Sequence, residues 1–236
     1  MTEHAAYNAD CFDILPQLET DSVDFVFADL PYGTTQNKWD TPIDLGKLWP
    51  ELSRVCKENA AMCFTCQQPF TTTLIASNLK RFRYEWIWEK PHATGHLNAK
   101  RMPMKAHENI AVFYRRLPTY NPQKTEGHKN YRVKAGVAPA TSYNDHVRTA
   151  TSSRDGTRYP RTVLSAGQQS KASQLHPTQK PVSLAEYMIK TYTNEGDLVL
   201  DPTAGVLTTR VAARNTGRRS CVIELDGEYF AKGMKR

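Results

Sequence analysis

The sequence has no long apolar run, no targeting segment and no repeat, and each absence narrows the class of protein. No stretch approaches the ~20 apolar residues of a membrane-spanning helix. Residues 1–17 lack the basic start and apolar core of a signal peptide, so we expect a cytoplasmic product without membrane contact. The 236 residues, 39% hydrophobic and 23% charged, fit one folded domain with or without an inserted module.

Cysteine is also scarce, and the five cysteines form no recognisable metal site. Cys63 and Cys66 have the CxxC spacing of zinc and redox sites. Neither a second CxxC pair nor a paired histidine cluster completes a zinc site. Residues 60–65 (AAMCFT) instead predict a buried strand, in which cysteine behaves as a small hydrophobe. We therefore expect no metal.

Positive charge is concentrated in one segment. The formal net charge is +7, from 31 Lys and Arg against 24 Asp and Glu. Residues 116–171 hold ten of the basic and three of the acidic residues, so the remaining 21 of each sign cancel. A neutral body with one basic segment favours a polyanionic partner such as nucleic acid. A solvated, poorly ordered loop is the alternative.

Strand and helix patterns alternate on both sides of this segment. Short apolar runs predict strands, and apolar residues at helical spacing predict helices. We expect strands at residues 23–28, 60–65, 84–88, 110–114, 198–200 and 220–225, and helices at 10–19, 45–58, 70–79, 182–192 and 208–215. Such alternation predicts an α/β domain with a mostly parallel central sheet. Residues 116–172 interrupt it as a loop-rich insert, so residues 1–115 and 173–236 form two halves of one domain.

One predicted strand ends in a segment suited to base binding. In open parallel sheets, ligands bind beyond the carboxyl ends of the strands. Residues 29–32 (DLPY) offer the Asp29 carboxylate, carbonyl oxygens constrained by Pro31 and the aromatic face of Tyr32. This set suits a planar heterocycle with an exocyclic amine, which the oxygens bind while Tyr32 stacks on the ring. Alternatively, Asp29 caps a turn and Tyr32 belongs to the core.

Several segments together resemble the motifs of amino-directed DNA methyltransferases, and they span nearly the whole chain outside the insert. The segments are 29–32 (DLPY, for the family's D-P-P-Y), 176–181 (HPTQKP), 201–209 (DPTAGVLTT, for the cofactor loop D-P-F-A-G-S-G-T-T), 223–229 (IELDGEY, for I-E-x-D-x-x-Y), 88–90 (WEK) and 107–109 (HEN). A D-x-P-Y segment alone is a weak signal, whereas HPTQKP is highly specific. In combination and in this order, they identify the chain as a member of that family.

The order of the segments implies a class and a target. The base-binding motif precedes the insert and the cofactor loop follows it, which resembles the β class, whose fold is circularly permuted. The resemblance implies a Rossmann-like methyltransferase that acts on double-stranded DNA as a monomer or homodimer, in a restriction-modification or phage setting. An Asp at the head of D-x-P-Y is typical of adenine-N6 enzymes, whereas N4-cytosine enzymes usually carry Ser. No Pro-Cys dipeptide occurs, which argues against the thiolate mechanism of C5-cytosine enzymes.

The resemblance assigns catalysis to Asp29, Pro31 and Tyr32. The target base lies inside a duplex, so it is flipped out at a cost of about a few kcal/mol, and Tyr32 replaces the lost stacking. Hydrogen bonds from the amine to Asp29 and to a nearby carbonyl favour an sp³-like nitrogen with an available lone pair. No nucleophile from the enzyme is needed.

The resemblance also implies the residues that hold the cofactor, S-adenosylmethionine. They are Asp10, Thr178, Lys180, Asp201, Thr203, Gly205 and Glu224. Glu224 is expected to accept from the ribose hydroxyls, Asp201 from the methionine amino group and Asp10 from the adenine amine, while residues 178 and 180 reach the methionine carboxylate. The alternative for each is structural: a turn cap, a strand end or a solvated side chain.

The cofactor loop departs from the family pattern. Val206 and Leu207 replace the last two residues of G-S-G, and Thr203 replaces an aromatic or apolar residue. The missing glycine is a place where backbone approaches the cofactor closely or takes a positive φ, so a β-branched residue followed by Leu strains or blocks the loop. A weakly active or inactive DNA-binding relative is therefore one alternative. An N4-cytosine enzyme, or an adenine-N6 enzyme acting on RNA, is another.

The basic insert occupies the target-recognition position of the family. Its basic residues alternate with Tyr and small polar residues, which suits phosphate contact and base stacking. The candidate DNA-binding residues are Arg132, Lys134, Arg148, Arg154, Arg158 and Arg161. Phosphate contacts give affinity without sequence information, so the sequence does not reveal the recognition site.

Overall fold

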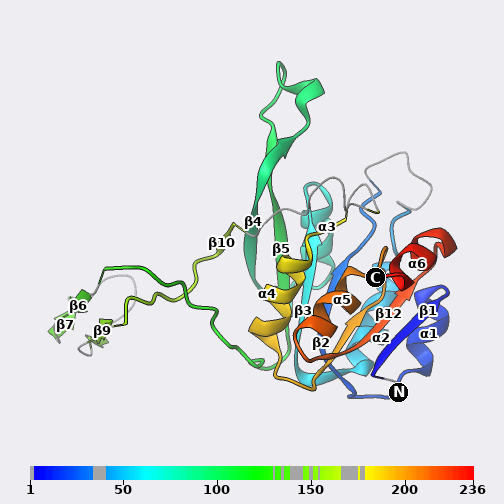
Figure 1. Cartoon of the computed structure of the whole chain (residues 1–236), viewed down its shortest axis with the longest axis horizontal. Helices are drawn as coiled ribbons and strands as arrows, with labels where there is room; N and C mark the ends of the chain where they lie inside the picture. Colours follow the sequence, from blue (N-terminus) through cyan, green and yellow to red (C-terminus); the bar gives the residue numbers. More distant parts are fainter. Residues whose placement is uncertain are drawn as a thin grey trace. The chain divides into compact units, whose positions relative to one another are not determined.

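The computed structural model of the chain describes residues 3–33, 41–129, 131–133, 136–138, 146–148, 151–153, 155–165, 175 and 179–236. These residues form two units. The first combines Met1–Asn121 with Thr162–Arg236, and the second is Pro122–Arg161. The first unit is an α/β domain built on one central sheet (Figure 1).

The sheet of the first unit is mostly parallel. In spatial order its strands are β1 (His4–Asn8), β12 (Arg219–Glu224), β11 (Leu198–Asp201), β2 (Val23–Asp29), β3 (Cys56–Cys66), β5 (Lys105–Phe113), β4 (Phe82–Thr94) and β10 (Val163–Leu164). Only β5, among these strands, runs antiparallel to its neighbours. The carboxyl ends of the other strands therefore share one edge of the sheet, which confirms the predicted fold class and locates the ligand-binding edge.

Helices cover both faces of this sheet, because successive strand residues point to opposite sides. The helices are α1 (Cys11–Ile14), α2 (Leu45–Val55) and α3 (Phe70–Ser77) on one face, α4 (Val182–Tyr192) and α5 (Thr208–Asn215) on the other, and α6 (Gly227–Met234). Figure 1 shows α4 and α5 in front of the sheet. In β2, Val26 packs in the layer of α1–α3, and Phe25 and Phe27 pack in the layer of α4 and α5. Both layers are buried, so β2 reads as a continuous apolar run.

The two cysteines of the CxxC segment face opposite layers. Both are fully buried in β3, where Cys63 packs in the α4–α5 layer and Cys66 in the α1–α3 layer. Burial raises the pKa of the Cys66 thiol to about 11, which disfavours the thiolate that metals and oxidants require. The segment is core packing, as its apolar neighbours indicate.

Several element boundaries differ from the predicted ones. The expected helix at 10–19 is wrong in length, because α1 ends at Ile14 and a 3₁₀ turn, Leu15–Gln17, follows it. That turn contains Pro16, which has no backbone N–H to continue an α-helix. The strands β4 and β5 are each much longer than expected, and β1 is a strand that the sequence patterns did not indicate.

The second unit is a β-ribbon, where a loop-rich insert was expected. Its strands are β6 (Tyr131–Val133), β7 (Gly136–Ala138), β8 (His146–Arg148) and β9 (Thr151–Ser153). β6 pairs with β9 and β7 with β8, both antiparallel, and Thr125 pairs with Arg158 near the base. In both strand pairs the numbers of the paired residues add to 284 (131 with 153, 138 with 146), so the two pairs continue one hairpin register.

Candidate active site

Four carboxylates lie at or just beyond the carboxyl ends of four neighbouring strands. Asp10 follows β1, Glu224 ends β12, Asp201 ends β11 and Asp29 ends β2. The parallel register pairs Asn8 with Glu224, Asp201 with Val222, and Leu200 with Val26, so these ends lie side by side. The sheet thus gathers the residues predicted for base binding and for cofactor binding along one edge.

Asp29 is the centre of a hydrogen-bonded network. Its Oδ2 accepts the ammonium of Lys180 at 2.8 Å, and its Oδ1 accepts the hydroxyl of Tyr32 at 2.7 Å and that of Thr65. Thr65 faces Asp29 because the two residues are paired in the β2–β3 register. Three donors from three parts of the chain therefore hold the carboxylate in one orientation.

Lys180 joins Asp29 to a second carboxylate, Glu108. Its Nζ lies 3.1 Å from Glu108 Oε2, and the ammonium of Lys90 lies 3.5 Å from Glu108 Oε1. Burial lowers the pKa of Lys180, but the charges of Asp29 and Glu108 outweigh it and raise that pKa above its usual value. Lys180, predicted to reach the methionine carboxylate, thus has two carboxylate partners of the protein, with which a cofactor carboxylate must compete.

Tyr32 packs beside the same network. Its ring stacks on Phe70 of α3, with centroids 5.1 Å apart, and Lys180 Nζ lies 5.9 Å from the ring centre. Burial, together with the charges of Asp29 and Glu108, raises the pKa of Tyr32 well above 10, so its hydroxyl stays a donor. Tyr32 was predicted either to pack in the core or to stack on a base. Its ring packs against the core cluster, and its hydroxyl binds the Asp29 carboxylate.

The loop after β11 is fixed by Asp201. This carboxylate is 4% exposed, and it accepts the Thr203 N–H at 3.1 Å and the Thr209 hydroxyl at 2.6 Å. Burial, only partly offset by these hydrogen bonds, raises the pKa of Asp201 to about 7. The Thr203 hydroxyl in turn donates to the main-chain carbonyl of Asp29 at 3.2 Å. Thr203 therefore connects this loop to the end of β2.

Two residues of the loop adopt left-handed backbone conformations. Gly205 has φ +53°, and Leu207 has φ +56° and ψ +37°. Leu207 stands where the family motif carries its second glycine, and its positive φ strains a residue that has a Cβ. The Leu207 side chain is fully buried, with Phe230 of α6 packed against its cluster.

Glu224 and Asp10 complete the edge. Glu224 accepts the Gly205 N–H at 2.6 Å and the Asp226 N–H at 2.7 Å, so it bridges two neighbouring loops. Burial raises the pKa of Glu224 despite these bonds. Asp10 is exposed and caps α1 by accepting the Phe12 N–H at 2.8 Å. Each carboxylate oxygen has more than one lone pair, so both residues can accept further donors.

Comparisons with known proteins give this arrangement a family. The family N6_N4_Mtase, described as DNA methylase, matches residues 23–235. The chain belongs to this DNA methylase family. The methylase is 27% identical over 248 residues to the DNA adenine methyltransferase YhdJ of Escherichia coli (strain K12), covering 97% of the chain and 81% of that protein. It is 23% identical over 254 residues to the Type II methyltransferase M2.LlaDCHI of Lactococcus lactis subsp. cremoris, covering 97% and 87%.

Solved structures show the same fold. The complex of M1.HpyAVI with SAM superposes on the methylase with a TM-score of 0.68 at 22% identity, covering 98% of this chain and 97% of that one. The cytosine-N4-specific PvuII DNA methyltransferase superposes with a TM-score of 0.67 at 14% identity, covering 97% and 84%. The methylase is thus a DNA methyltransferase with S-adenosylmethionine as its methyl donor. No helix in its described ranges has the length and apolar character needed to cross a membrane.

The predicted DNA-binding residues of the methylase all lie in the second unit. Lys134 and Arg154 fall outside the described residues, as does Thr178 of the cofactor set. Arg132 is exposed on β6, and Arg148 ends β8. Arg161, the last residue of the unit, is exposed.

Arg158 has a role within the ribbon. Its guanidinium donates to the carbonyl of Thr157 at 2.7 Å and to the carbonyl of Lys129 on the facing strand. Its backbone also pairs with Thr125 in both directions, at 2.9 and 3.0 Å. The side chain therefore closes the base of the ribbon, which a count of basic residues does not reveal.

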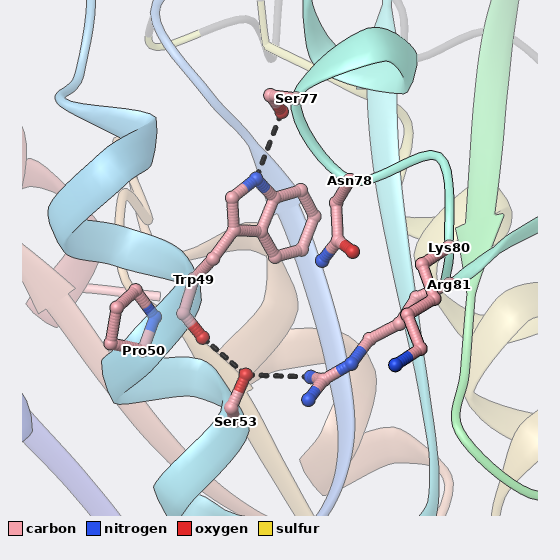
Figure 2. Close-up of a pocket in the computed structure, with 7 residues that line it drawn as sticks. All are labelled: Trp49, Pro50, Ser53, Ser77, Asn78, Lys80 and Arg81. Atoms are coloured by element: carbon pink, nitrogen blue, oxygen red, sulfur yellow. Dashed lines mark hydrogen bonds between the residues drawn. The ribbon is translucent and has the colours of Figure 1, made fainter.

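A pocket of about 340 Å³ lies elsewhere on the methylase, between α2, α3 and the loop before β4 (Figure 2). In it the Trp49 indole N–H donates to Ser77 Oγ at 2.9 Å, and Arg81 donates to Ser53 Oγ at 2.6 Å. None of the predicted site residues lines it. The chemistry of the family points to the carboxyl edge of the sheet, so we do not assign the active site to this pocket.

Sequence reasoning gave no role to three residues of the Asp29 network. Glu108 and Lys90 lie in segments that match family motifs, and Thr65 is the last residue of a predicted strand. The signal for Thr65 was its place at a strand end next to the DLPY strand. The signal for Glu108 was an acidic residue entering a predicted apolar strand, but its partner Lys180 is 72 residues away in the chain.

Proposed function

We propose that the methylase transfers a methyl group from S-adenosylmethionine to adenine N6 in duplex DNA. The observation that carries the proposal is the Asp29 carboxylate, held by Lys180, Tyr32 and Thr65 at the end of a central strand. A carboxylate is an acceptor only, so it suits the N–H group of an exocyclic amine.

In this proposal the residues of the protein orient the amine and leave the transfer to the cofactor. When bound, S-adenosylmethionine would supply an electrophilic methyl group: the amine nitrogen would gain this group and lose one proton, and the S–C bonding electrons would stay on sulfur. Asp29 and a carbonyl beside Pro31 accept the amine N–H bonds. Tyr32 would stack on the flipped base and replace part of the stacking that the base loses when it leaves the duplex. The network of three donors keeps the acceptor from turning away.

The residues of the cofactor half fit this cofactor. S-adenosylmethionine has three kinds of donor: an ammonium, ribose hydroxyls and an adenine amine. The carboxyl edge of the sheet presents acceptor carboxylates at Asp201, Glu224 and Asp10. Burial raises the pKa of Asp201 and of Glu224. We propose that Asp201 takes the ammonium and Glu224 the ribose hydroxyls, with Thr203, Gly205, Thr178 and Lys180 completing the site.

Adenine is favoured over cytosine by the residue at the head of the motif. Both target amines are donors, so hydrogen bonding to Asp29 alone does not distinguish them. The Asp of D-x-P-Y is typical of adenine-N6 enzymes, and the relative YhdJ is named a DNA adenine methyltransferase. We also propose the β-class, permuted order of motifs, with residues 116–172 as the target-recognition insert between the halves 1–115 and 173–236.

A weak or inactive relative is the second candidate function, because Leu207 replaces a glycine in a left-handed conformation. Calorimetric titration with S-adenosylmethionine separates the two. Binding that Asp201→Ala abolishes supports the enzyme, whereas no binding at millimolar cofactor leaves only a DNA-binding role.

The assignment of Asp29 has its own test. Asp29→Ala should abolish methyl transfer to plasmid DNA, measured with labelled cofactor, while DNA affinity changes less than about threefold, because the residue acts on one amine and not on the phosphates. Full activity with a large loss of DNA affinity would show that Asp29 is misassigned.

A further inference from the structure

The hairpin of β4 and β5 continues beyond the sheet as an exposed arm, residues 91–107. Figure 1 shows this hairpin extending beyond the sheet. Every residue of the arm is exposed, whereas Trp86 and Trp88 of β4 and the last four residues of β5 are buried. The pairing of Thr94 with Lys105 extends the ladder, and the 3₁₀ turn His96–Asn98 lies near its tip. Because the arm buries little of its surface, core packing does not explain which residues it contains.

The arm leaves the sheet at the edge that carries the candidate active site. β4 is antiparallel to β5, and β5 is antiparallel to β3, so β4 runs in the same direction as β3 and β2. The carboxyl end of β4, where the arm begins, therefore lies at the same edge as Asp29. The arm is also joined to that site chemically, because Lys90 at its base pairs with Glu108, and Glu108 pairs with Lys180.

The arm carries positive charge without any acid. Residues 91–107 contain Lys100, Arg101 and Lys105 and no Asp or Glu, which gives +3 with histidines neutral. Lys105 donates to Gln67 at 3.0 Å. The Lys100 and Arg101 side chains make no hydrogen bond or ion pair with the residues that the structure describes. The zero net charge of the chain outside the basic insert conceals this local excess.

The tip also exposes large apolar side chains. Leu97 is 88% exposed and Met102 is 53% exposed, and both lie within a few residues of Lys100 and Arg101. Exposed apolar residues flanked by cations fit a partner with a charged backbone and an apolar interior. Duplex DNA has this chemistry, since phosphates surround the stacked bases and apolar side chains can enter between base steps.

We propose that the arm is a second DNA-contacting element, which binds the duplex beside the flipped base. Lys100 and Arg101 contact phosphates, and Leu97 packs against the bases that the flipped nucleotide leaves unstacked. The inference rests on the proposed function, because it takes duplex DNA as the substrate. It adds an element outside residues 116–172, where the sequence alone placed DNA binding.

The charges are tested by salt-dependent binding of a duplex to the full chain. Lys100→Ala/Arg101→Ala should reduce the slope of log affinity against log salt by about 1.8, since each phosphate contact contributes ~0.9. The matched control is Lys80→Ala/Lys190→Ala, which removes two exposed charges from the opposite, amino end of the strands. The control should keep the slope, and both variants should keep the cofactor affinity of the wild type.

The tip is tested by methylation of duplex and single-stranded DNA of one sequence. Leu97→Ala should lower kcat/KM on the duplex by about tenfold and leave the single strand nearly unchanged, because flipping a base out of the duplex costs more unpairing and unstacking energy. Leu79→Ala is the control, since Leu79 is 67% exposed near the amino end of β4. Sedimentation of each variant reports whether the oligomeric state changes.

Three results would overturn the inference. An unchanged salt slope in the arm variant would show that Lys100 and Arg101 do not contact phosphates. Equal losses of kcat/KM on duplex and single strand would show that Leu97 does not replace stacking. Self-association that the arm variant alone loses would make the arm an interface between copies of the chain. A wild-type protein without DNA affinity or activity would instead refute the proposed function itself, and the arm proposal with it.

Discussion

At the scale of the residue, one lysine of the candidate site pairs with two carboxylates. Lys180 is shared by Asp29 and Glu108, and it is the cation nearest to Asp29 that we find in the described part of the chain. Lys180→Met removes the ammonium that binds both carboxylates, so Asp29 loses one of the three donors that orient it. We expect kcat to fall at least tenfold, measured by steady-state kinetics. Lys180→Arg keeps the charge and should retain most of the activity.

Glu108 positions Lys180 and does not touch the base in our proposal. Glu108→Gln removes one charge at nearly constant shape. It should lower the free energy of unfolding by roughly 1.5–3 kcal/mol, the usual range for hydrogen bonds to charged groups, and it should lower kcat more than it changes KM for DNA. Urea unfolding and steady-state kinetics measure both. A changed KM with an unchanged kcat would place Glu108 in substrate binding instead.

If Asp201 binds the cofactor ammonium, as we propose, cofactor affinity depends on pH. Its pKa of about 7 in the folded protein lies above the ordinary value of 3.8, so the carboxyl is largely protonated at pH 6. A cofactor ammonium prefers the ionised form, and affinity should therefore rise from pH 6 to pH 8 with release of a proton. Calorimetry in two buffers of different ionisation enthalpy measures that proton. Asp201→Asn should bind weakly at every pH, whereas a flat wild-type profile would restrict Asp201 to holding its loop.

The raised pKa of Asp201 also makes the stability of the folded protein depend on pH. Because the pKa is raised on folding, protonation of Asp201 stabilises the folded state. This contribution is complete below about pH 4 and is lost as the pH rises through about 7. Bound cofactor should reverse the trend by favouring the ionised carboxylate.

At the scale of the element, the cofactor loop is supported by α6. Gly233 of α6 lies so close to the loop that a Cβ there would come within 2.4 Å of Leu207 Cγ and 2.8 Å of the Val206 carbonyl carbon. Arg236 also donates to the Val206 carbonyl at 2.9 Å. The strained conformation of Leu207 is therefore held by contacts from a helix about 25 residues later in the chain.

Gly233→Ala tests this support. The added methyl group must displace the loop backbone, so we expect a loss of roughly 1–3 kcal/mol in unfolding free energy, typical of overpacking, and weaker cofactor binding. Gly46→Ala in α2 is the matched control, because the Cβ there meets only one flexible carboxylate at 3.2 Å. Thermal unfolding and calorimetry compare the two variants. Equal behaviour would show that α6 does not position the loop.

The sequence predicted best those elements whose bounds are set by local patterns of apolar and helix-ending residues. The bounds of α4 and α5 agree with those expected, because an apolar stripe and clear end signals define both helices. The arm was missed because residues 91–107 have no core-facing alternation to mark a strand. The ribbon in Pro122–Arg161 was missed because no sustained apolar period marks its short strands, which pair through backbone hydrogen bonds.

At the scale of the whole molecule, the ribbon can be removed without cutting into the α/β unit. Asn121 N–H donates to the Thr191 carbonyl at 2.7 Å, and the Thr162 carbonyl accepts the Ile87 N–H at 2.7 Å, so both flanks are anchored to the first unit. Replacing residues 122–161 with a Gly-Ser linker should keep the melting transition and the cofactor affinity. DNA affinity at physiological salt should fall at least 100-fold, because most of the excess charge is lost. A small loss would locate DNA binding elsewhere, with the arm as the first place to examine.

The candidate site as a whole was only partly predictable. Asp29, Asp201 and Glu224 could be placed at strand ends from the sequence, because parallel strands share an edge, whereas Asp10 came from the family resemblance alone. The pairing of Asp29 with Lys180 could not be predicted, since tertiary packing brings Lys180 to it from 151 positions away. The sequence predicted the excess charge of the basic insert but not that of the arm, because acidic residues elsewhere outside the insert cancel the +3 of the arm.

The most direct measurement is mass spectrometry of nucleosides from DNA treated with the purified protein and S-adenosylmethionine. We predict N6-methyladenine with the wild type and none with Asp29→Ala, while both proteins bind the cofactor. N4-methylcytosine in place of N6-methyladenine would contradict the assigned target base. No methylated nucleoside at all, from a protein that binds both DNA and cofactor, would contradict the assigned activity.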